Sequence, residues 1–276
     1  MTRIGLRGFA RAVHIKVVAA GIGAAGIAVA GAANAADMPP LKAPVLHAPY
    51  NWSGCYVGGF FGWGVANDWN STDLRNFSNT AASGTPGPGP SNWLFSLNSS
   101  PTGGGYLGCN WQPTPGGGFV FGIDGEGGYL QLSAPGAQPL TVVFPAVGGT
   151  TNITDAVKLG TGYGMVAGRV GYVFLEKIHI YGKVGVAFYN ETSSIIDANL
   201  PGGPKIASGS KSQTPLAFGG GAEYPLTEHW IGKAEYLYFE KGSSYTATGV
   251  GVAAGFNWKE DPSTVQTFKL GAAYKF

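Results

Sequence analysis

Residues 264–276 contain the stretch that decides the fold, which reads Thr-Val-Gln-Thr-Phe-Lys-Leu-Gly-Ala-Ala-Tyr-Lys-Phe. Apolar or aromatic side chains occupy every second position from Phe268 to Phe276, and mostly polar or small residues stand between them. Successive side chains of a β-strand point to opposite faces, so the alternation predicts a strand with one apolar face. The same pattern recurs in residues 118–130 and 178–189.

Eight segments have this character, and most are close to the length that a tilted strand needs to cross a bilayer. They are Gly54–Ala66, Gly103–Gln112, Gly118–Leu130, Leu159–Phe174, Ile178–Tyr189, Thr214–Tyr224, Trp230–Phe239 and Thr264–Phe276. The long connections are residues 67–102, 131–158, 190–213 and 240–263, and the short ones are 113–117, 175–177 and 225–229. Long outer loops that alternate with tight periplasmic turns are typical of an outer-membrane barrel.

The composition supports this interpretation. Charged residues make up 12% of the chain, about half the usual share in soluble domains, yet no uninterrupted apolar run is long enough for a transmembrane helix. A membrane protein without such helices satisfies its backbone by closing a sheet. We therefore predict an all-β fold, an eight-stranded antiparallel up-and-down transmembrane β-barrel. The alternative is a secreted β-sandwich, and the net charge of +2 gives no reason to expect a nucleic-acid partner.

The N-terminal region has the three parts of a secretory signal peptide. A basic region from Arg3 to Lys16 precedes an apolar run, Val17 to Ala30, and a cleavage site follows at Ala33-Asn34-Ala35. We expect residues 1–35 to be the signal peptide, 36–50 a Pro-rich periplasmic leader and 51–276 the barrel, exported by the Sec route to the outer membrane of a Gram-negative bacterium. The alternative for the first segment is an N-terminal anchor helix.

The polar face of the predicted strands carries four acidic and four basic residues. They are Asp124, Glu126, Arg169, Lys183, Glu223, Lys233, Glu235 and Lys269. The interior of an eight-stranded barrel is just wide enough for side chains to fill, and charges there must be paired or hydrated. We expect a structural network that plugs the lumen, with Arg169 beside Asp124 and Glu126, Lys183 beside Glu223, and Lys269 beside Glu235. The alternative is a proton or ion path.

The only two cysteines, Cys55 and Cys109, fall near the same end of two neighbouring strands and share parity with the apolar residues. The periplasm is oxidising, so we expect a cross-strand disulfide. The alternative is two lipid-facing thiols that behave as small apolar residues.

No enzymatic, metal or cofactor site is expected. The four histidines, at positions 14, 47, 179 and 229, do not cluster. His179 is expected to point inward near Glu223, but a hydrolase needs a nucleophile and base held together in an accessible site. Aromatic residues at or near strand ends are expected at the membrane–water interface, with ordinary β-propensity as the alternative. They are Trp52, Trp63, Trp111, Trp230, Tyr172, Tyr224, Tyr236, Tyr238 and Tyr274.

Several short motifs resemble the small alphaproteobacterial outer-membrane barrel proteins, known as outer-membrane immunogenic proteins or porin-family proteins with an outer-membrane β-barrel domain. The matching pieces are residues 36–40 (Ala-Asp-Met-Pro-Pro), 50–59 (Tyr-Asn-Trp-Ser-Gly-Cys-Tyr-Val-Gly-Gly), 108–112, 119–122, 168–172, 219–224, 233–238 and 269–276. They span residues 36 to 276 in the family's order. The family usually has an aromatic residue at position 55 and no cysteine at 109, so the paired departure favours the disulfide.

The resemblance implies a role in envelope integrity and surface antigenicity, with diffusion or ligand binding for some members, and no shared catalytic residues. It also implies that Tyr274 and the terminal aromatic Phe276 are the signal that the barrel-assembly machinery reads. We expect a monomer whose partners are outer-membrane lipid, lipopolysaccharide and that machinery. The alternatives to a structural barrel are a narrow passive channel and a surface adhesin or receptor for an unknown ligand.

Overall fold

The computed structural model describes residues 49–74, 91–134, 140–144, 149–197, 205–251 and 254–276. The predicted signal peptide and residues 36–48 of the predicted leader lie outside these ranges. Within them, no helix is both long enough and apolar enough to cross a membrane.

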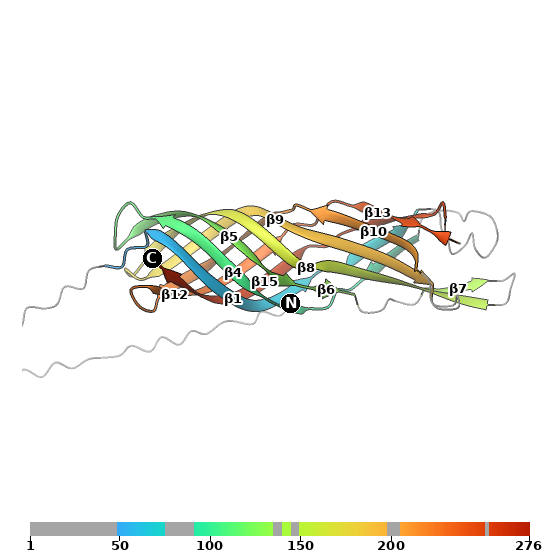
Figure 1. The fold of residues 1–276 in the computed structure, drawn as a ribbon, viewed down its shortest axis with the longest axis horizontal. Coiled ribbons are helices and arrows are strands. Elements are labelled where there is room, and N and C mark those ends of the chain that lie inside the picture. Colours follow the sequence, from blue (N-terminus) through green and yellow to red (C-terminus); the bar gives the residue numbers. More distant parts are fainter. Residues whose placement is uncertain (1–48, 75–90, 135–139, 145–148, 198–204, 252–253) are drawn as a thin grey trace, which may run out of the picture. The chain divides into compact units, whose positions relative to one another are not determined.

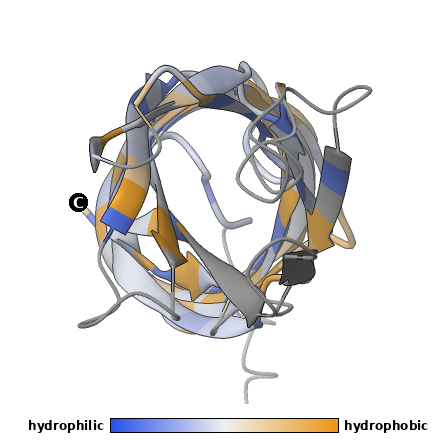
Figure 2. Ribbon diagram, turned by 90° about the vertical axis from the view of Figure 1, so that its right-hand side faces the viewer, coloured by the Kyte–Doolittle hydropathy of each residue, from blue (hydrophilic) through white to orange (hydrophobic). Residues whose placement is uncertain are grey.

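Eight antiparallel strands form a closed ring, which confirms the predicted fold class (Figures 1 and 2). They are β1 (Gly54–Ala66), β4 (Ser100–Trp111), β5 (Gly118–Leu130), β8 (Gly149–Phe174), β9 (Ile178–Asp197), β11 (Leu216–Pro225), β12 (Trp230–Phe239) and β15 (Val265–Lys275). Each strand pairs with its neighbour in this order, and β15 pairs with β1 to close the ring. Closure leaves these eight strands no free edge within the membrane.

The outer surface of the ring is apolar and its inner surface is mixed. On β1, Phe61 is 68% exposed whereas Tyr56 is buried, and on β5 Ile123 is 69% exposed whereas Val120 is buried. This arrangement is the reverse of a soluble sandwich, whose apolar faces point inward.

Aromatic side chains cluster on the outer surface near the end with the short turns. Phe119 packs edge-on against Tyr172, with ring centroids 5.3 Å apart, and Trp230 packs likewise against Tyr274 at 5.6 Å. The prediction for Trp52 was wrong. Its side chain is completely buried at the barrel mouth, because it packs among the buried side chains of Val120, Val173 and Ile231.

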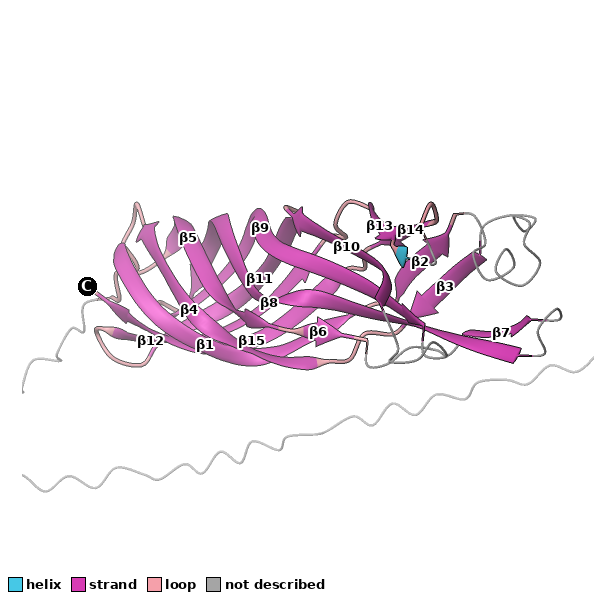
Figure 3. Ribbon diagram, turned by 45° about the vertical axis from the view of Figure 1, so that its right-hand side comes forward, coloured by secondary structure: helices cyan, strands magenta, loops and turns pink. Residues whose placement is uncertain are grey.

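In the described parts of the long connections, which were predicted only as loops, seven further strands are present (Figure 3). They are β2 (Trp69–Asp73), β3 (Ser91–Phe95), β6 (Leu132–Ser133), β7 (Leu140–Phe144), β10 (Lys205–Gln213), β13 (Tyr245–Gly249) and β14 (Asn257–Asp261). Strands β3, β2, β14, β13 and β10 pair in that order and join β9, which together with β8 continues beyond the barrel wall. These strands and the outer parts of β8 and β9 are called the outer sheet below.

The outer sheet forms because the barrel holds its strands side by side. Beyond Phe188 on β9, the outward side chains of Asn190 and Thr192 are polar, so the apolar belt ends there. The backbone groups that follow still need partners. Pairing therefore continues outward, with a register shift between Leu159 and Tyr163 of β8.

Candidate functional site

Strand β9 shows how the lumen is organised, because its odd-numbered side chains from His179 to Ile195 point inward. From the periplasmic end outward they include His179, Lys183 and Glu191, all buried. The other predicted lumen charges come from β5, β8, β11, β12 and β15, and all eight are buried in the structure. The eight side chains and His179 are called the inner network.

Arg169 and Glu223 form the periplasmic part of the inner network. The guanidinium donates two hydrogen bonds to the carboxylate, with N···O distances of 2.8 and 2.6 Å. Nδ1 of His179 lies 2.9 Å from Oε2 of Glu223. The guanidinium carbon lies 4.4 Å from the centre of the Tyr181 ring. Glu223 is therefore held from two sides, and the arginine is held by both a carboxylate and an aromatic face.

Three lysines share the acids in the middle of the lumen. Nζ of Lys183 lies 3.1 Å from Glu126 and 3.2 Å from Glu235. Lys233 pairs with Glu235 at 2.9 Å, and Lys269 pairs with Glu126. These links join three lysines and two glutamates into one cluster, and Asp124, 3.5 Å from Lys183, supplies the third acid that balances its charge.

Asp124 connects the two parts of the inner network, 3.5 Å from Lys183 and 3.8 Å from Arg169. The predicted pair of Lys183 with Glu223 was wrong: Glu223 pairs with Arg169 instead. The reason is the length of the side chains, which extend across a narrow lumen and bond to residues of strands that are not their neighbours in the barrel wall. The predicted contacts of Arg169 with Asp124 and of Lys269 with Glu235 are present, the latter at 3.9 Å. The predicted pair of Arg169 with Glu126 was wrong, because Glu126 pairs with Lys183 and Lys269 instead.

Glycines on the inner wall make room for these long side chains. A Cβ atom on Gly171 would collide with Nε2 of His179, and a Cβ on Gly122 would lie 3.1 Å from Cγ of Arg169. The glycine content of the strands therefore has a specific role at these two positions, which is to admit a large polar side chain from the neighbouring strand.

The inner network leaves little free space. The gap bounded by Phe60, Tyr106, Glu126, Glu235 and neighbouring side chains has no volume that a water-sized sphere can occupy. On the periplasmic side Trp52 closes the mouth by packing with Val120, Val173 and Ile231. Its ring centre lies 4.9 Å from that of His179. The indole therefore covers the periplasmic end of the inner network.

An apolar layer covers the other end of the inner network. Leu237 follows Glu235 by two residues on the inner face of β12, and it packs with Leu130, Leu159 and Phe239, all of them buried. Ions that approach the inner network from either side therefore meet apolar side chains before they meet its charges.

A second polar cluster lies beyond this layer, and the sequence analysis missed it. Glu260 accepts hydrogen bonds from Nε1 of Trp69 at 2.9 Å and from the Ser71 hydroxyl at 3.1 Å. Glu191 accepts one from Nε2 of Gln213 at 2.7 Å. Both glutamates are completely buried, and no ion pair to either is seen in the part of the chain that the structure describes. These five residues are called the outer carboxyl pocket.

The outer carboxyl pocket favours protonated acids. Burial raises the pKa of Glu191 to about 7, and the nearby Glu260 carboxylate adds to the rise, while Gln213 and Lys211 oppose it. Burial likewise raises the pKa of Glu260, against the hydrogen bonds from Trp69 and Ser71. Glu191 continues the parity of Lys183, but the predicted strand ended at Tyr189, and its neutral partners come from strands that were not predicted.

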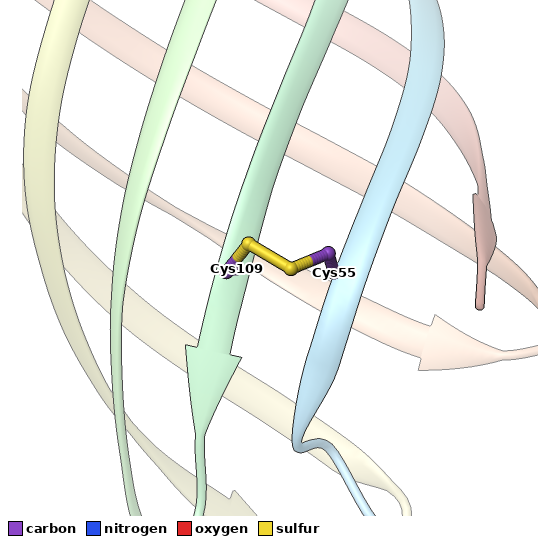
Figure 4. The surroundings of a disulfide bond; sticks show 2 residues. All are labelled: Cys55 and Cys109. Carbon is purple, nitrogen blue, oxygen red and sulfur yellow. A yellow bond between two sulfur atoms is a disulfide. The ribbon is translucent and has the colours of Figure 1, made fainter.

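The two cysteines lie opposite each other on β1 and β4 and are joined by a disulfide, with their Cα atoms 4.0 Å apart (Figure 4). Both side chains are on the outer surface of the barrel. Across the described ranges, no group of three His, Cys, Asp or Glu side chains is arranged to hold a metal ion.

Comparison with known families agrees with this geometry. The family model described as "Outer membrane protein beta-barrel domain" matches residues 22–276. The chain belongs to this family. The barrel is therefore an outer-membrane protein of a Gram-negative bacterium.

Curated relatives of this family member come from Brucella. The 25 kDa outer-membrane immunogenic protein of Brucella melitensis is 27% identical over 241 residues, which cover 86% of each chain. The 31 kDa outer-membrane immunogenic protein of the same organism is 25% identical, over 86% of this chain and 88% of the relative.

Solved structures with a similar barrel include the attachment invasion locus protein Ail of Yersinia pestis, with a TM-score of 0.37 and 17% identity over 81% of this chain and 99% of that one. The outer membrane protein OprG of Pseudomonas aeruginosa has a TM-score of 0.42 and 12% identity, over 83% and 99% of the two chains.

Proposed function

We propose that this protein is a structural outer-membrane barrel with a closed lumen, which contributes to envelope integrity and carries the outer sheet at the cell surface. The observation that carries the proposal is the packing of the inner network, whose central gap admits no water-sized sphere. An ion moves through a pore only where water or polar ligands replace its hydration shell at each step. A dry gap between fixed ion pairs offers neither.

The layers above and below the network support the same proposal. Trp52 packs into the periplasmic mouth, and the layer around Leu237 and Phe239 fills the lumen on the outer side. The balanced charges also argue against a selectivity lining, which usually has one sign. A catalytic role is not part of the proposal, because His179 is completely buried between Glu223 and Trp52, where no substrate reaches it.

The proposed partners follow from the same surfaces. Membrane lipid and lipopolysaccharide cover the apolar belt of a monomeric barrel, and the barrel-assembly machinery reads Tyr274 and Phe276 during insertion. The relatives are named for their immunogenicity, which is consistent with a surface-exposed outer sheet. The adhesin or receptor alternative would use that sheet and the segments between its strands, and it stays a prediction.

Conductance in planar lipid bilayers tests the closed lumen against the narrow channel. We expect the wild-type protein to give no stable openings. The double variant Glu126→Ala/Lys269→Ala removes a bonded pair from the central gap without changing net charge, and we expect it to open a path once Trp52→Ala and Leu237→Ala remove the apolar covers at the two ends. Stable openings of the wild type that none of these changes alters would contradict the plug.

The matched control is Lys259→Ala/Asp261→Ala. This pair, 2.9 Å apart, lies at the surface of β14 with the lysine side chain 47% exposed. Its removal also deletes one positive and one negative charge, but outside the lumen, so the bilayer current should stay at the wild-type level.

A further inference from the structure

The disulfide lies where chemistry on a thiol is difficult once the barrel is in the membrane. Cys55 and Cys109 are on the lipid-facing surface, in line with Val57 and Leu107, and Trp111 of the aromatic cluster follows Cys109 by two residues. The nucleophile in disulfide formation is the thiolate. A thiolate in contact with lipid loses its hydration without gaining a partner, which is costly.

The strands that the disulfide joins are poorly specified by their own side chains. β1 contains five glycines and β4 contains four, three of them consecutive at positions 103–105. Register is weakly determined in glycine-rich strands, and a slip of one residue turns every side chain to the opposite face. A slip here would carry Tyr56 and Phe60 out of the lumen and Val57 and Phe61 into it.

β1 is also the strand at which the barrel closes. It pairs with β15 over its whole length from Tyr56, and the backbone N–H of Phe276 donates to the carbonyl oxygen of Cys55 at 3.0 Å. An error in the register of β1 against β4 would therefore be transmitted to the closing seam between β1 and β15.

We propose that Cys55 and Cys109 are a modification site for a periplasmic protein that oxidises pairs of thiols. This protein joins the two cysteines before the barrel enters the membrane, and the new disulfide fixes the register of β1 against β4. The oxidant is a protein that carries a reactive disulfide. One cysteine thiolate attacks that disulfide and forms a mixed disulfide, releasing one thiolate of the oxidant. The second cysteine thiolate then attacks the mixed disulfide and displaces the other thiolate of the oxidant. Two electrons pass to the oxidant, which leaves as a dithiol. The two cysteine protons pass to solvent or to the oxidant's thiolates.

The order of events can be measured in cells that make the protein. Newly synthesised chains are pulse-labelled, free thiols are blocked with a maleimide at successive times, and samples are run without reductant and without boiling. We expect the oxidised form to appear before the heat-modifiable, folded barrel. Folded barrels that first accumulate with two alkylatable thiols would overturn the proposal.

Purified protein tests the physical reason for that order. The reduced chain is exposed to oxidised glutathione either in urea or after it has folded into lipid vesicles. We expect disulfide formation to be at least ten times slower in the vesicles. Equal rates would show that contact with lipid does not slow oxidation of the thiols. The disulfide would then have no need to form before the barrel enters the membrane, which would contradict the proposal.

Assembly into vesicles then tests the effect on register. The oxidised chain should give several times more heat-modifiable barrel than the reduced chain or the variant Cys55→Ala/Cys109→Ala. In that double variant, adding Val57→Cys and Leu107→Cys places a new pair at directly opposed positions of the same two strands. Oxidation of this pair before folding should restore the yield, whereas equal yields from all chains would refute a role in register.

Discussion

The inner network and the outer carboxyl pocket both bury acidic side chains inside the barrel. They stabilise these acids in two different ways. Glu223, on the inner side, is bonded to Arg169, whereas Glu191, on the outer side, is bonded to a neutral amide. Pairing preserves the charge of an acid, and neutral donors favour its protonated form. The inner half is therefore stabilised by opposite charges and the outer half by a bound proton.

The largest expected effect comes from breaking a pair in the inner network. Arg169→Ala leaves the buried Glu223 carboxylate without its bidentate partner, which we expect to lower the free energy of unfolding by about 3–5 kcal/mol. Urea titration of the protein folded in lipid vesicles, followed by tryptophan fluorescence, measures the change.

The matched control for that variant is Arg169→Met/Glu223→Leu, which fills the same space with apolar side chains. Because replacing a buried ion pair by apolar groups is often neutral, this variant should be much closer to the wild type than Arg169→Ala. A loss below about 1 kcal/mol for the single variant would mean that the pair is hydrated, and the contrast with the outer carboxyl pocket would disappear.

The next largest effect is a dependence of stability on pH, which we expect only in the outer sheet. The pKa of Glu191 is raised from about 4.5 in the unfolded chain to about 7 in the folded one. The folded sheet therefore holds a proton that the unfolded chain releases, so its stability is full below about pH 4.5 and falls as the pH rises towards 7. The loss amounts to at most about 3 kcal/mol and levels off above pH 7.

Hydrogen exchange at pH 5 and pH 8, corrected for intrinsic rates, measures this loss. Backbone amides of β10, β13 and β14 should become less protected at pH 8, while those of β11 and β12 serve as the internal reference. Glu191→Gln keeps the shape of the side chain and removes its titration, so most of the pH effect should vanish. An unchanged pH effect in that variant would assign it to other groups.

A smaller effect tests the neutral donors of the outer carboxyl pocket. Trp69→Phe keeps an aromatic ring but removes the Nε1–H that bonds to Glu260, which should cost about 1–2 kcal/mol in the outer sheet. Because that hydrogen bond lowers the pKa of Glu260, its loss should raise this pKa further. The control Trp63→Phe changes a lipid-facing indole and should leave exchange in the outer sheet unchanged; equal effects of both would point to the loss of ring size alone.

The barrel strands could be predicted because their information is local. Strands β1, β5 and β12 have the predicted bounds, since alternation between lipid and lumen imposes a period of two over a fixed length. The outer sheet has no lipid on one side, so segments such as Lys205–Gln213 lack the apolar half of that pattern. Their pairing depends on strands far away in the sequence.

The members of the inner network could also be predicted, but not all of its bonds. Parity places Lys183 and Glu223 inside, yet it says nothing about which acid a flexible lysine reaches across the lumen. Trp52 was misplaced for a related reason: a general preference of tryptophan for the interface was outweighed by a specific space at the barrel mouth, left by Val120, Val173 and Ile231.

The continuation of β9 beyond the membrane determines which surface of the protein is exposed outside the cell. Asp197 lies nine residues beyond Phe188, at which the continuous series of apolar outward side chains on β9 ends. At a rise of ~3.3 Å per residue and a tilt of ~40°, this part of the strand rises roughly 20 Å above the apolar belt. A large molecule that approaches the cell from outside therefore meets a paired sheet before it meets lipid. This surface is assembled from strands that are distant in the sequence, so a short peptide from one strand does not reproduce it.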